Sequence, residues 1–251
     1  MAILGVFFDF GYVIGFPRSG IGRKYFYLDW DGTDGILKDP ELAPKLRPGV
    51  GRAELEDFLL HEIYDIFVEH EQSDLIDPQS NRLFLNRLHL VFGCPIDQPL
   101  VDKLLVHLDT MKYIAIDAAA VKVIAELKQR GFQVSLVSNM MLPGRLLKAK
   151  LQEAHLLSAF ASVAISSDVG FIKPHPEIFR RTLEQSQLSA DEVVFVGDTY
   201  QQDILGAKQV GLQTVWLNNR QEPRAKAEGN PPGYEIEAIS QLIALPIFAG
   251  K

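Results

Sequence analysis

The sequence predicts an α/β fold, in which a parallel sheet is covered by helices on both faces and a mostly helical domain is inserted after the first strand. Residues 117–251 alternate between apolar runs and amphipathic segments, the pattern of buried parallel strands joined by helices. The run ILGVFF at residues 3–8 has the same fully buried character. Residues 16–114, which separate it from the other strands, have helical periodicity and no strand pattern.

The elements of the predicted core follow one another in a regular order. After the first strand, the next unit begins at Asp117, which can cap a helix over residues 118–130 that ends at Gly131. Apolar runs predict the later strands at 132–138, 161–166, 192–197 and 212–217. Amphipathic segments predict helices at 146–155, 176–186 and 203–211, and a closing helix around 235–245.

The inserted segment divides into a loop-like part and a helical part. Residues 16–50 are rich in Gly, Pro and Asp and are expected to form loops. Residues 51–71 place apolar side chains on one helical face, Asp77 and Pro78 open a second helix, and a third is expected over 99–113. The predicted boundaries are therefore a core of residues 1–15 and 115–251 and a helical domain of residues 16–114.

The composition excludes several classes of site. The chain has 251 residues, a net charge of −7 and no prominent basic run, so neither nucleic acid nor a membrane is an expected partner. The single cysteine, Cys94, rules out a disulfide within the chain and a multi-cysteine zinc site, and we expect it to be a packing residue. The N-terminal apolar run is short, lacks a basic lead and is interrupted by Asp9, which favours a cytoplasmic protein without a signal peptide or membrane span.

Polar and charged residues follow the ends of four predicted strands. They are Asp9 after the first strand, Ser138 and Asn139 after the second, Lys173 after the third, and Asp198 and Asp203 after the fourth. Ligands bind beyond the carboxyl ends of the strands in an open parallel sheet, so we expect these residues to converge. Taken singly, each has a simpler explanation: the Ser138 hydroxyl would form a local hydrogen bond, Lys173 would be a solvated surface charge, and Asp203 would cap a helix. In this order and together they predict an active site.

Such a cluster suits phosphoryl transfer. Three carboxylates brought together repel one another, and a hard divalent cation with oxygen ligands, Mg²⁺, relieves that repulsion. The cation and Lys173 would neutralise a phosphate beside Asp9, whose carboxylate can attack phosphorus and form an acyl-phosphate that water hydrolyses. The Ser138 hydroxyl and the Asn139 backbone amide can donate to the transferring oxygens. We therefore predict that Asp9, Ser138 and Lys173 are catalytic, and that Asn139 and Lys173 bind phosphate. The predicted metal ligands are Asp9, Asp198 and Asp203.

Four motifs in this order resemble those of the haloacid dehalogenase superfamily, whose members are mostly Mg²⁺-dependent phosphatases. The motifs are FFDFGYVI, LVSN, GFIKPHPEIF and VGDTYQQD, and with the inserted domain the resemblance covers nearly the whole chain. It implies a Rossmann-like core and, because the insert lies between the first two motifs, a helical cap of the C1 type. It also implies that the backbone carbonyl of Gly11 is a metal ligand.

Gly11 is also where the sequence departs from the superfamily pattern. Typical phosphatases of the superfamily have a second aspartate at this position, two residues after the nucleophile, which acts as general acid and base. Glycine keeps the carbonyl but lacks the side chain that protonates the leaving oxygen, an effect typically worth about 10²–10⁴ in rate. We therefore expect slow turnover of substrates with poor leaving groups, unless a donor from the cap or the substrate compensates.

Two aspartates compete for the role of nucleophile, because the segment YLDWDGT at 27–33 carries a D-x-D-G-T signature. Asp9 follows six uncharged residues that suit a buried strand, whereas the run before Asp29 begins with a lysine and follows a loop containing Gly and Pro. Asp9 is therefore the predicted nucleophile, and the segment from Asp29 to Thr33 is expected to be a turn-rich part of the early cap. Asp9→Asn should abolish turnover, and Asp29→Asn should leave most of it.

Three functions are compatible with these residues. The first is a phosphatase that acts on a small phosphorylated metabolite under a closing cap. Four residues after the first strand are possible substrate contacts, although a solvated flap is the simpler explanation: Arg18, Arg23, Lys24 and Tyr25. The second is a metal-independent haloacid dehalogenase, which would leave Asp198 and Asp203 without a role. The third is a weakened protein that binds a ligand or regulates a partner, which Gly11 supports. No sustained heptad indicates an oligomeric state.

Overall fold

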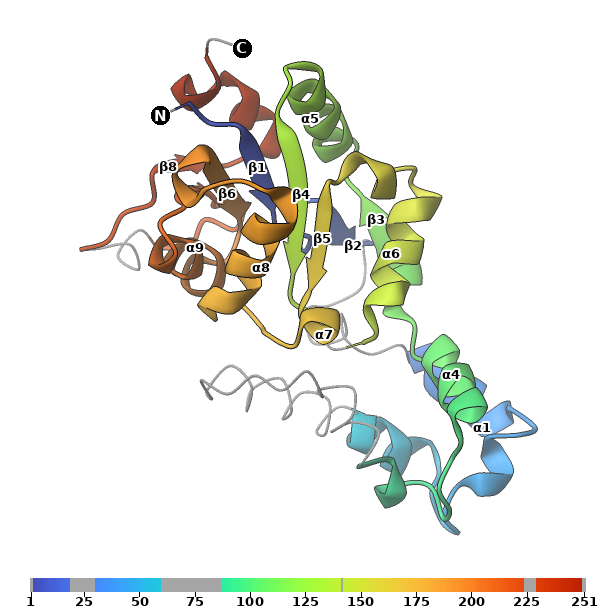
Figure 1. Ribbon diagram of the computed structural model, residues 1–251. Coiled ribbons are helices and arrows are strands. Elements are labelled where there is room, and N and C mark those ends of the chain that lie inside the picture. The colour runs from blue at the N-terminus through green and yellow to red at the C-terminus, as the bar shows by residue number, and fades with distance from the viewer. Residues whose placement is uncertain (1, 19–29, 60–86, 141, 224–228, 250–251) are drawn as a thin grey trace.

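Six parallel strands form the centre of the computed structural model, which describes residues 2–18, 30–59, 87–140, 142–223 and 229–249 (Figure 1). The strands are β1 (Gly5–Phe8), β4 (Gln133–Ser138), β5 (Ser162–Ile165), β6 (Val193–Gly197), β7 (Gln213–Leu217) and β8 (Tyr234–Ile236). Their order is β5-β4-β1-β6-β7-β8, and every neighbouring pair is parallel. The predicted α/β class is confirmed, and β1 joins the sheet between β4 and β6.

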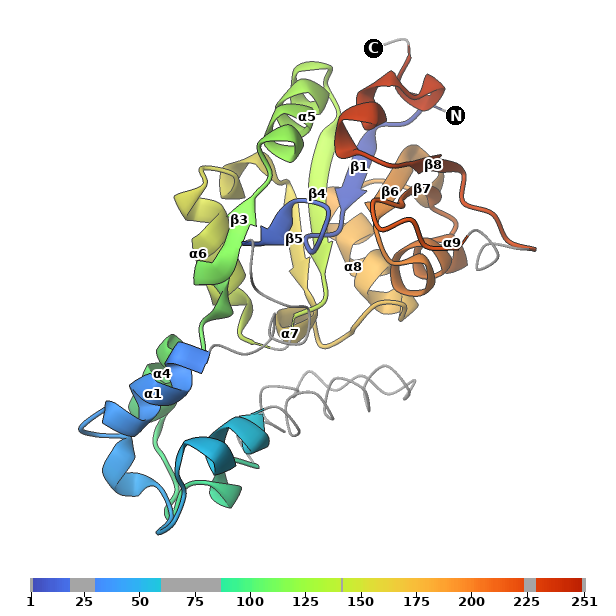
Figure 2. The same ribbon diagram turned by 180° about the vertical axis from the view of Figure 1, so that it is seen from behind.

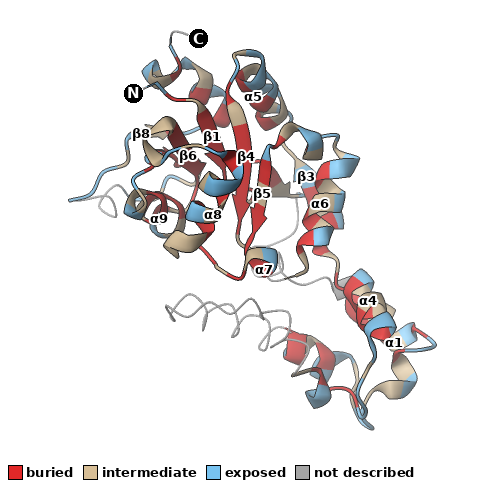
Figure 3. Cartoon of the chain, in the orientation of Figure 1, coloured by how far each residue is buried: buried red, intermediate tan, exposed pale blue. Residues whose placement is uncertain are grey.

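Helices cover both faces of this sheet (Figures 1 and 2). α5 (Ala118–Gln129) and α6 (Gly144–Glu153) pack on one face, and α8 (Pro176–Ser186) and α9 (Gly206–Gln209) pack on the other. Side chains alternate along a strand, so Phe8 belongs to the apolar core under α5 and α6, and Phe7 to the core under α8 and α9. Figure 3 shows the buried strands between these layers of helices. Burial of each large apolar side chain stabilises the fold by about 1.5–3 kcal/mol.

Local signals determine where the core helices begin and end. The Asp117 carboxylate accepts a 3.0 Å hydrogen bond from the Ala119 amide and caps α5 as predicted, and Gly131 follows that helix in a left-handed conformation with a φ of +84°. Pro176 begins α8, where its missing N–H breaks no helical hydrogen bond, and His175 Nδ1 accepts a 3.1 Å bond from the following turn. The predicted helices at 118–130 and 176–186 therefore correspond to α5 and α8.

The inserted segment has an apolar core of its own. It contains α1 (Trp30–Lys38), a helical stretch at 52–59, a short 3₁₀ turn at Leu88–Leu90 and α4 (Gln98–His107). Buried side chains from these elements pack together, among them Ile36, Leu59 and Leu104. Figure 1 shows α1 beside α4, on the side of the molecule toward which β4 and β5 point. Most of the helix predicted at 51–71, and the start of the helix predicted from Asp77, lie outside the described residues.

Two expectations for the insert are wrong. Residues 16–50 are not loop-like throughout, because α1 begins at Trp30, within the segment expected to be turn-rich. The glycines and aspartates of this segment have low helix propensity, yet α1 forms and its Ile36 is fully buried. Gly35 allows α4 to pack closely, because a Cβ at Gly35 would lie 2.5 Å from His107 Nδ1. Strands also occur at the margins of the insert, where β2 (Gly15–Pro17) pairs antiparallel with β3 (Ile114–Ile116). The predicted domain boundaries fall within this pair of strands.

The C-terminal end of the core also differs from the prediction. Residues 235–245 form no closing α-helix: β8 pairs with β7, and a 3₁₀ helix follows at Ile239–Ala244. Ile236 and Leu242 are buried in the core shared with α5, so tertiary contacts override the helical periodicity of this segment. The helix predicted at 203–211 starts earlier, as a π-helical turn at Tyr200–Leu205 that leads into α9. α7 (Ser166–Val169) has no counterpart in the prediction.

Two expectations drawn from composition can be compared with the structure. Cys94 is exposed, so the expectation that it is a packing residue is wrong. It lies just beyond Phe92, the last buried side chain of that stretch. None of the helices in the described ranges is both long enough and apolar enough to cross a bilayer.

Candidate active site

The predicted site residues meet at the carboxyl ends of β1, β4 and β6. β1 lies between the other two strands, and in an open α/β sheet such a crossover position is where ligands bind. Asp9 follows β1, and its backbone amide donates a 2.9 Å hydrogen bond to the Val196 carbonyl of β6. Ser138 ends β4 and Asp198 follows β6, so three neighbouring strands bring polar residues to one edge of the sheet.

Lys173 joins two of the predicted acids. Its Nζ lies 2.6 Å from Asp9 Oδ1 and 2.6 Å from Asp203 Oδ1, and its side chain is only 2% exposed. Burial by itself would lower the pKa of Lys173, but the charges of Asp203 and Asp9 outweigh that effect and raise the pKa, so the ammonium group stays charged. The simpler explanation of a solvated lysine is therefore excluded.

Asp198 completes a cluster with Asp9 and Asp203. Each of the three buried residues places one carboxylate oxygen within 4.8 Å of the others. Burial raises the pKa of Asp9 to about 6, although the charge of Lys173 opposes this rise. Burial and the charges of the two neighbouring acids also push the pKa of Asp198 upward, and the Arg220 guanidinium, 2.7 Å from its Oδ2, opposes that rise. The cluster therefore favours the arrival of further positive charge.

Asp203 reaches the cluster because Gly197 has no side chain. A Cβ at Gly197 would lie 2.3 Å from Asp203 Cβ, far closer than two non-bonded carbon atoms approach. The Thr199 backbone amide donates a 2.9 Å hydrogen bond to Asp203 Oδ2, while Oδ1 accepts from Lys173. The helix that contains Asp203 begins at Tyr200, and its N-cap residue is Thr199. The simpler explanation of Asp203 as the N-cap residue of a helix that starts at 203 is therefore wrong.

The environment of Asp198 fits a metal ion. Trp216 Nε1 donates a 3.0 Å hydrogen bond to the Asp198 carbonyl, and Thr199 Oγ1 lies 3.3 Å from its Oδ1. The other carboxylate oxygen, Oδ2, is buried and accepts no hydrogen bond, although Arg220 Nη2 forms an ion pair with it at 2.7 Å. Three buried carboxylates, one of which has an oxygen with a cation beside it but no aligned hydrogen bond, are a donor set that suits a hard cation such as Mg²⁺.

Ser138 and Asn139 lie beside the acids on the β4 side. The Ser138 hydroxyl is buried and makes only a long 3.4 Å contact with the Asn139 carbonyl. The Asn139 side chain bonds twice to the backbone of Lys173, donating from Nδ2 to the carbonyl at 3.0 Å and accepting at Oδ1 from the amide at 2.7 Å. This positioning of Lys173 is a role that sequence reasoning missed. The predicted use of the Asn139 backbone amide stays a prediction.

Gly11 lies in the turn between β1 and β2. Apart from the adjacent residues, a Cβ built on Gly11 would have Asp9 Oδ2 as its neighbour, at 3.8 Å, so the position has room for a side chain. The assignment of the Gly11 carbonyl as a metal ligand stays a prediction.

Most of the candidate substrate contacts after the first strand cannot be compared with the structure. Arg18 is exposed, whereas Arg23, Lys24 and Tyr25 lie outside the described residues. Asp29 also lies outside them, so the choice of Asp9 over Asp29 stays a prediction.

The loop after β7 adds residues that sequence reasoning missed. Besides its ion pair with Asp198, Arg220 places Cζ 5.2 Å from the centroid of the Tyr12 ring. Asn219 Nδ2 donates a 2.7 Å hydrogen bond to the Tyr12 carbonyl, in the turn that follows Asp9. The sequence NNR at 218–220 follows a predicted strand, so the rule that selected the other strand-end residues would have found these as well.

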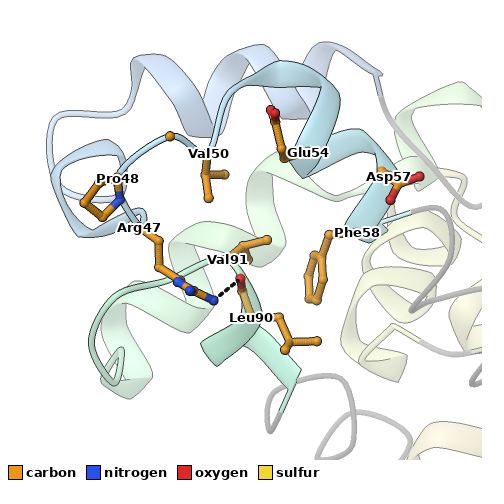
Figure 4. A pocket seen from close by; sticks show the side chains of 9 residues that line it. Arg47, Pro48, Val50, Glu54, Asp57, Phe58, Leu90 and Val91 are labelled. Atoms are coloured by element: carbon orange, nitrogen blue, oxygen red, sulfur yellow. Dashed lines mark hydrogen bonds between the residues drawn. The ribbon is translucent and has the colours of Figure 1, made fainter.

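A separate pocket lies on the inserted segment, between residues 47–58 and 90–91 (Figure 4). Its volume is about 450 Å³, and Arg47 Nη1 donates a 3.2 Å hydrogen bond to the Leu90 carbonyl at its wall. It contains none of the predicted site residues, so the acid cluster is the better candidate for the reaction.

Comparisons with known proteins show what the chain is similar to. A family model described as haloacid dehalogenase-like hydrolase matches residues 48–211. The glyceraldehyde 3-phosphate phosphatase of Pyrococcus abyssi is 33% identical over 113 residues, which cover 44% of this chain and 46% of that protein. The phosphoserine phosphatase of Thermus thermophilus is 35% identical over 100 residues, which cover 40% and 39%. The chain thus spans less than half of the length of these two relatives.

Solved structures resemble the chain over nearly its full length. A HAD phosphatase from Thermococcus onnurineus has a TM-score of 0.65 at 22% identity, covering 100% of this chain and 99% of that one. YfnB from Bacillus subtilis, solved with magnesium bound, has a TM-score of 0.60 at 21% identity, covering 99% and 100%. A 2-haloacid dehalogenase from Pseudomonas syringae has a TM-score of 0.64 at 21% identity, covering 96% and 97%. Identities this low support the fold alone.

Proposed function

Because this chain belongs to the haloacid dehalogenase-like hydrolase family, we propose that it is a Mg²⁺-dependent phosphatase that acts on a small phosphorylated metabolite through an aspartyl-phosphate at Asp9. The observation that carries this proposal is the buried cluster of Asp9, Asp198 and Asp203, whose oxygens lie within 4.8 Å of one another. Two relatives are named as phosphatases, which supports the same choice.

The three acids and the Gly11 carbonyl are the groups that would hold Mg²⁺. When bound, the ion supplies positive charge that neutralises the transferring phosphoryl oxygens. A metal ligand must be deprotonated, and burial raises the pKa of Asp9 to about 6, so this carboxyl group must release its proton as the ion enters. Metal affinity should therefore increase with pH.

Asp9 is the proposed nucleophile. Lys173 holds Oδ1 at 2.6 Å, and Oδ2 lies toward Gly11. Attack of a carboxylate oxygen on phosphorus forms the acyl-phosphate and breaks the bond to the leaving oxygen, which departs with the electron pair. Water then attacks phosphorus, inorganic phosphate leaves, and the Asp9 carboxylate is restored.

The neighbouring residues orient and stabilise the phosphate. Lys173 fixes the Asp9 carboxylate and adds one positive charge beside the transferring group. The Ser138 hydroxyl and the Asn139 backbone amide are the proposed donors to the phosphate oxygens. The Asn139 side chain holds the backbone of Lys173, so a change there would also displace the ammonium group.

The leaving group has no acid at position 11, because that residue is glycine. The proposed enzyme therefore favours substrates whose leaving oxygen is a weak base and needs little protonation. The inserted domain, residues 16–114, is the proposed cap of the C1 type, which would exclude water and select the substrate when it closes over the site.

The two alternative functions are weaker. A metal-independent dehalogenase would leave the close approach of three buried acids unexplained, and the similar TM-scores of a phosphatase and a dehalogenase do not discriminate between the two functions. A weakened protein that binds a ligand or a partner is supported by Gly11 alone.

Activity measurements with and without Mg²⁺ test the proposal. Purified protein is assayed against a panel of phosphorylated metabolites, together with Asp9→Asn and Asp117→Asn. We expect Mg²⁺-dependent phosphate release that Asp9→Asn abolishes. Asp117→Asn should retain it, because asparagine caps α5 as well as aspartate does. Activity that survives in Asp9→Asn would contradict the proposed nucleophile, and halide release from a haloacid without Mg²⁺ would favour the dehalogenase.

A further inference from the structure

Arg220 connects two segments of the proposed site that are distant in sequence. From the loop after β7, its Nη2 lies 2.7 Å from Asp198 Oδ2, and its Cζ lies 5.2 Å from the centroid of the Tyr12 ring. The loop itself is held by Asn218, which accepts a 2.7 Å bond from the Glu222 amide and donates a 3.0 Å bond to the Glu222 carbonyl. Arg220 is therefore delivered to Asp198 by an ordered turn.

Both partners in the contact between Arg220 and Asp198 have a buried polar atom that forms no hydrogen bond in the portion of the chain that the structure describes. Arg220 Nη2 lies 2.7 Å from the buried Asp198 Oδ2 without being aligned as a donor to it. It donates long hydrogen bonds instead, to the Asp198 carbonyl at 3.4 Å and to Thr199 Oγ1 at 3.5 Å. Arg220 Nε is buried as well and has no hydrogen-bond partner. Well-made arginine–carboxylate pairs use two aligned N–H donors, so this pair is easier to exchange than most.

We propose that Arg220 is the counter-ion of Asp198 in the metal-free protein and that Mg²⁺ must displace it, so that Arg220 lowers the affinity of the site for the metal. This inference rests on the proposed function and adds to it a residue that determines the Mg²⁺ concentration at which the enzyme becomes active. Within the described parts of the chain, Lys173 and Arg220 are the cations in contact with the three acids. Of these two cations, Arg220 is the one beside Asp198 Oδ2, the acid oxygen that accepts no hydrogen bond from the described residues.

The surroundings of Arg220 allow this displacement. Its side chain is 23% exposed, whereas that of Lys173 is 2% exposed, so Arg220 can regain water when it leaves Asp198. A second carboxylate is already near, since Glu222 Oε1 lies 3.7 Å from Arg220 Nη2. The guanidinium can therefore move toward Glu222 and the Tyr12 ring without losing all of its partners.

Mg²⁺ affinity, measured by calorimetry without substrate, tests the proposal. Arg220→Met removes the charge but keeps an unbranched side chain against Tyr12, and Arg220→Lys keeps the charge. Because an ion pair in a partly exposed position is weak, we expect Arg220→Met to bind Mg²⁺ about two- to fivefold more tightly than the original protein. Arg220→Lys should change the affinity less. Arg130→Met is the matched control, because Arg130 is 27% exposed and pairs with Glu126 on α5, and it should leave Mg²⁺ binding unchanged.

The direction of the change separates this role from a structural one. If Arg220 only supported the fold of the site, Arg220→Met would bind Mg²⁺ more weakly, and that result, or an unchanged affinity, would overturn the proposal. Arg220→Gln provides a second neutral variant, and the concentration of Mg²⁺ for half-maximal activity should fall by the same factor as the dissociation constant. If the original protein binds no Mg²⁺, the proposed function fails together with this inference. If it binds Mg²⁺ and Arg220→Met is no tighter, the inference alone fails.

Discussion

Gly11→Asp should convert this site into one with its own general acid. The position has room for the new side chain, because a Cβ there would meet Asp9 Oδ2 at 3.8 Å, an ordinary van der Waals contact. Its carboxyl group would then stand beside the Asp9 carboxylate, which itself belongs to a cluster of three acids. Burial and like charges raise the pKa of a carboxyl group, so the new aspartate should keep a proton that it can donate.

The expected gain depends on the leaving group. General acid catalysis typically contributes about 10²–10⁴ in rate, and we expect a gain near the lower limit because nothing has oriented the new carboxyl group. For an alkyl phosphate, whose leaving oxygen is strongly basic, kcat should rise by about 10². For p-nitrophenyl phosphate, whose leaving oxygen is a weak base, kcat should hardly change.

The assay compares kcat for these two substrates at saturating Mg²⁺. Gly11→Asn is the matched control, because asparagine has nearly the same size and shape but no acidic proton. A gain in Gly11→Asp that is no larger than in Gly11→Asn, or that is equal for both substrates, would refute the reasoning that Gly11 leaves the site without a general acid.

Three further changes test the electrostatics of the cluster. Lys173→Met leaves Asp9 and Asp203 buried without their shared cation, so the free energy of unfolding in urea should fall by about 3–5 kcal/mol, and an unchanged value would contradict the pairing. Gly197→Ala forces a Cβ against Asp203 and should cost about 1–3 kcal/mol of stability and weaken Mg²⁺ binding in calorimetry. The raised pKa of Asp9, to about 6, means that the folded protein holds a proton that the unfolded chain has released. The metal-free protein should therefore lose stability between about pH 4 and about pH 6, by about 1.4 kcal/mol per unit of pKa shift, and Mg²⁺ should restore it at about pH 7. Equal stability at about pH 4 and about pH 7 in EDTA would count against this.

Much of the core could be predicted because its signals are local. The predicted strands at 192–197 and 212–217 correspond to β6 and β7, and the predicted helix at 176–186 has the bounds of α8. The closing helix at 235–245 and the loop at 16–50 are wrong for one physical reason. Short segments with ambiguous periodicity take the conformation that their neighbours impose, as β7 imposes on β8 and α4 on α1.

By itself the sequence determined which residues stand at the strand ends, because apolar runs and the polar residues after them can be read one segment at a time. Only the tertiary structure decided which atoms meet there. Lys173 contacts Asp9 across 164 positions of the chain, and the partners of Asp198 include Trp216 and Arg220 from a strand and loop further on. Hydrogen bonds and ion pairs depend on distances of a few ångströms, and those distances are set by how the strands and helices pack, which no local pattern contains.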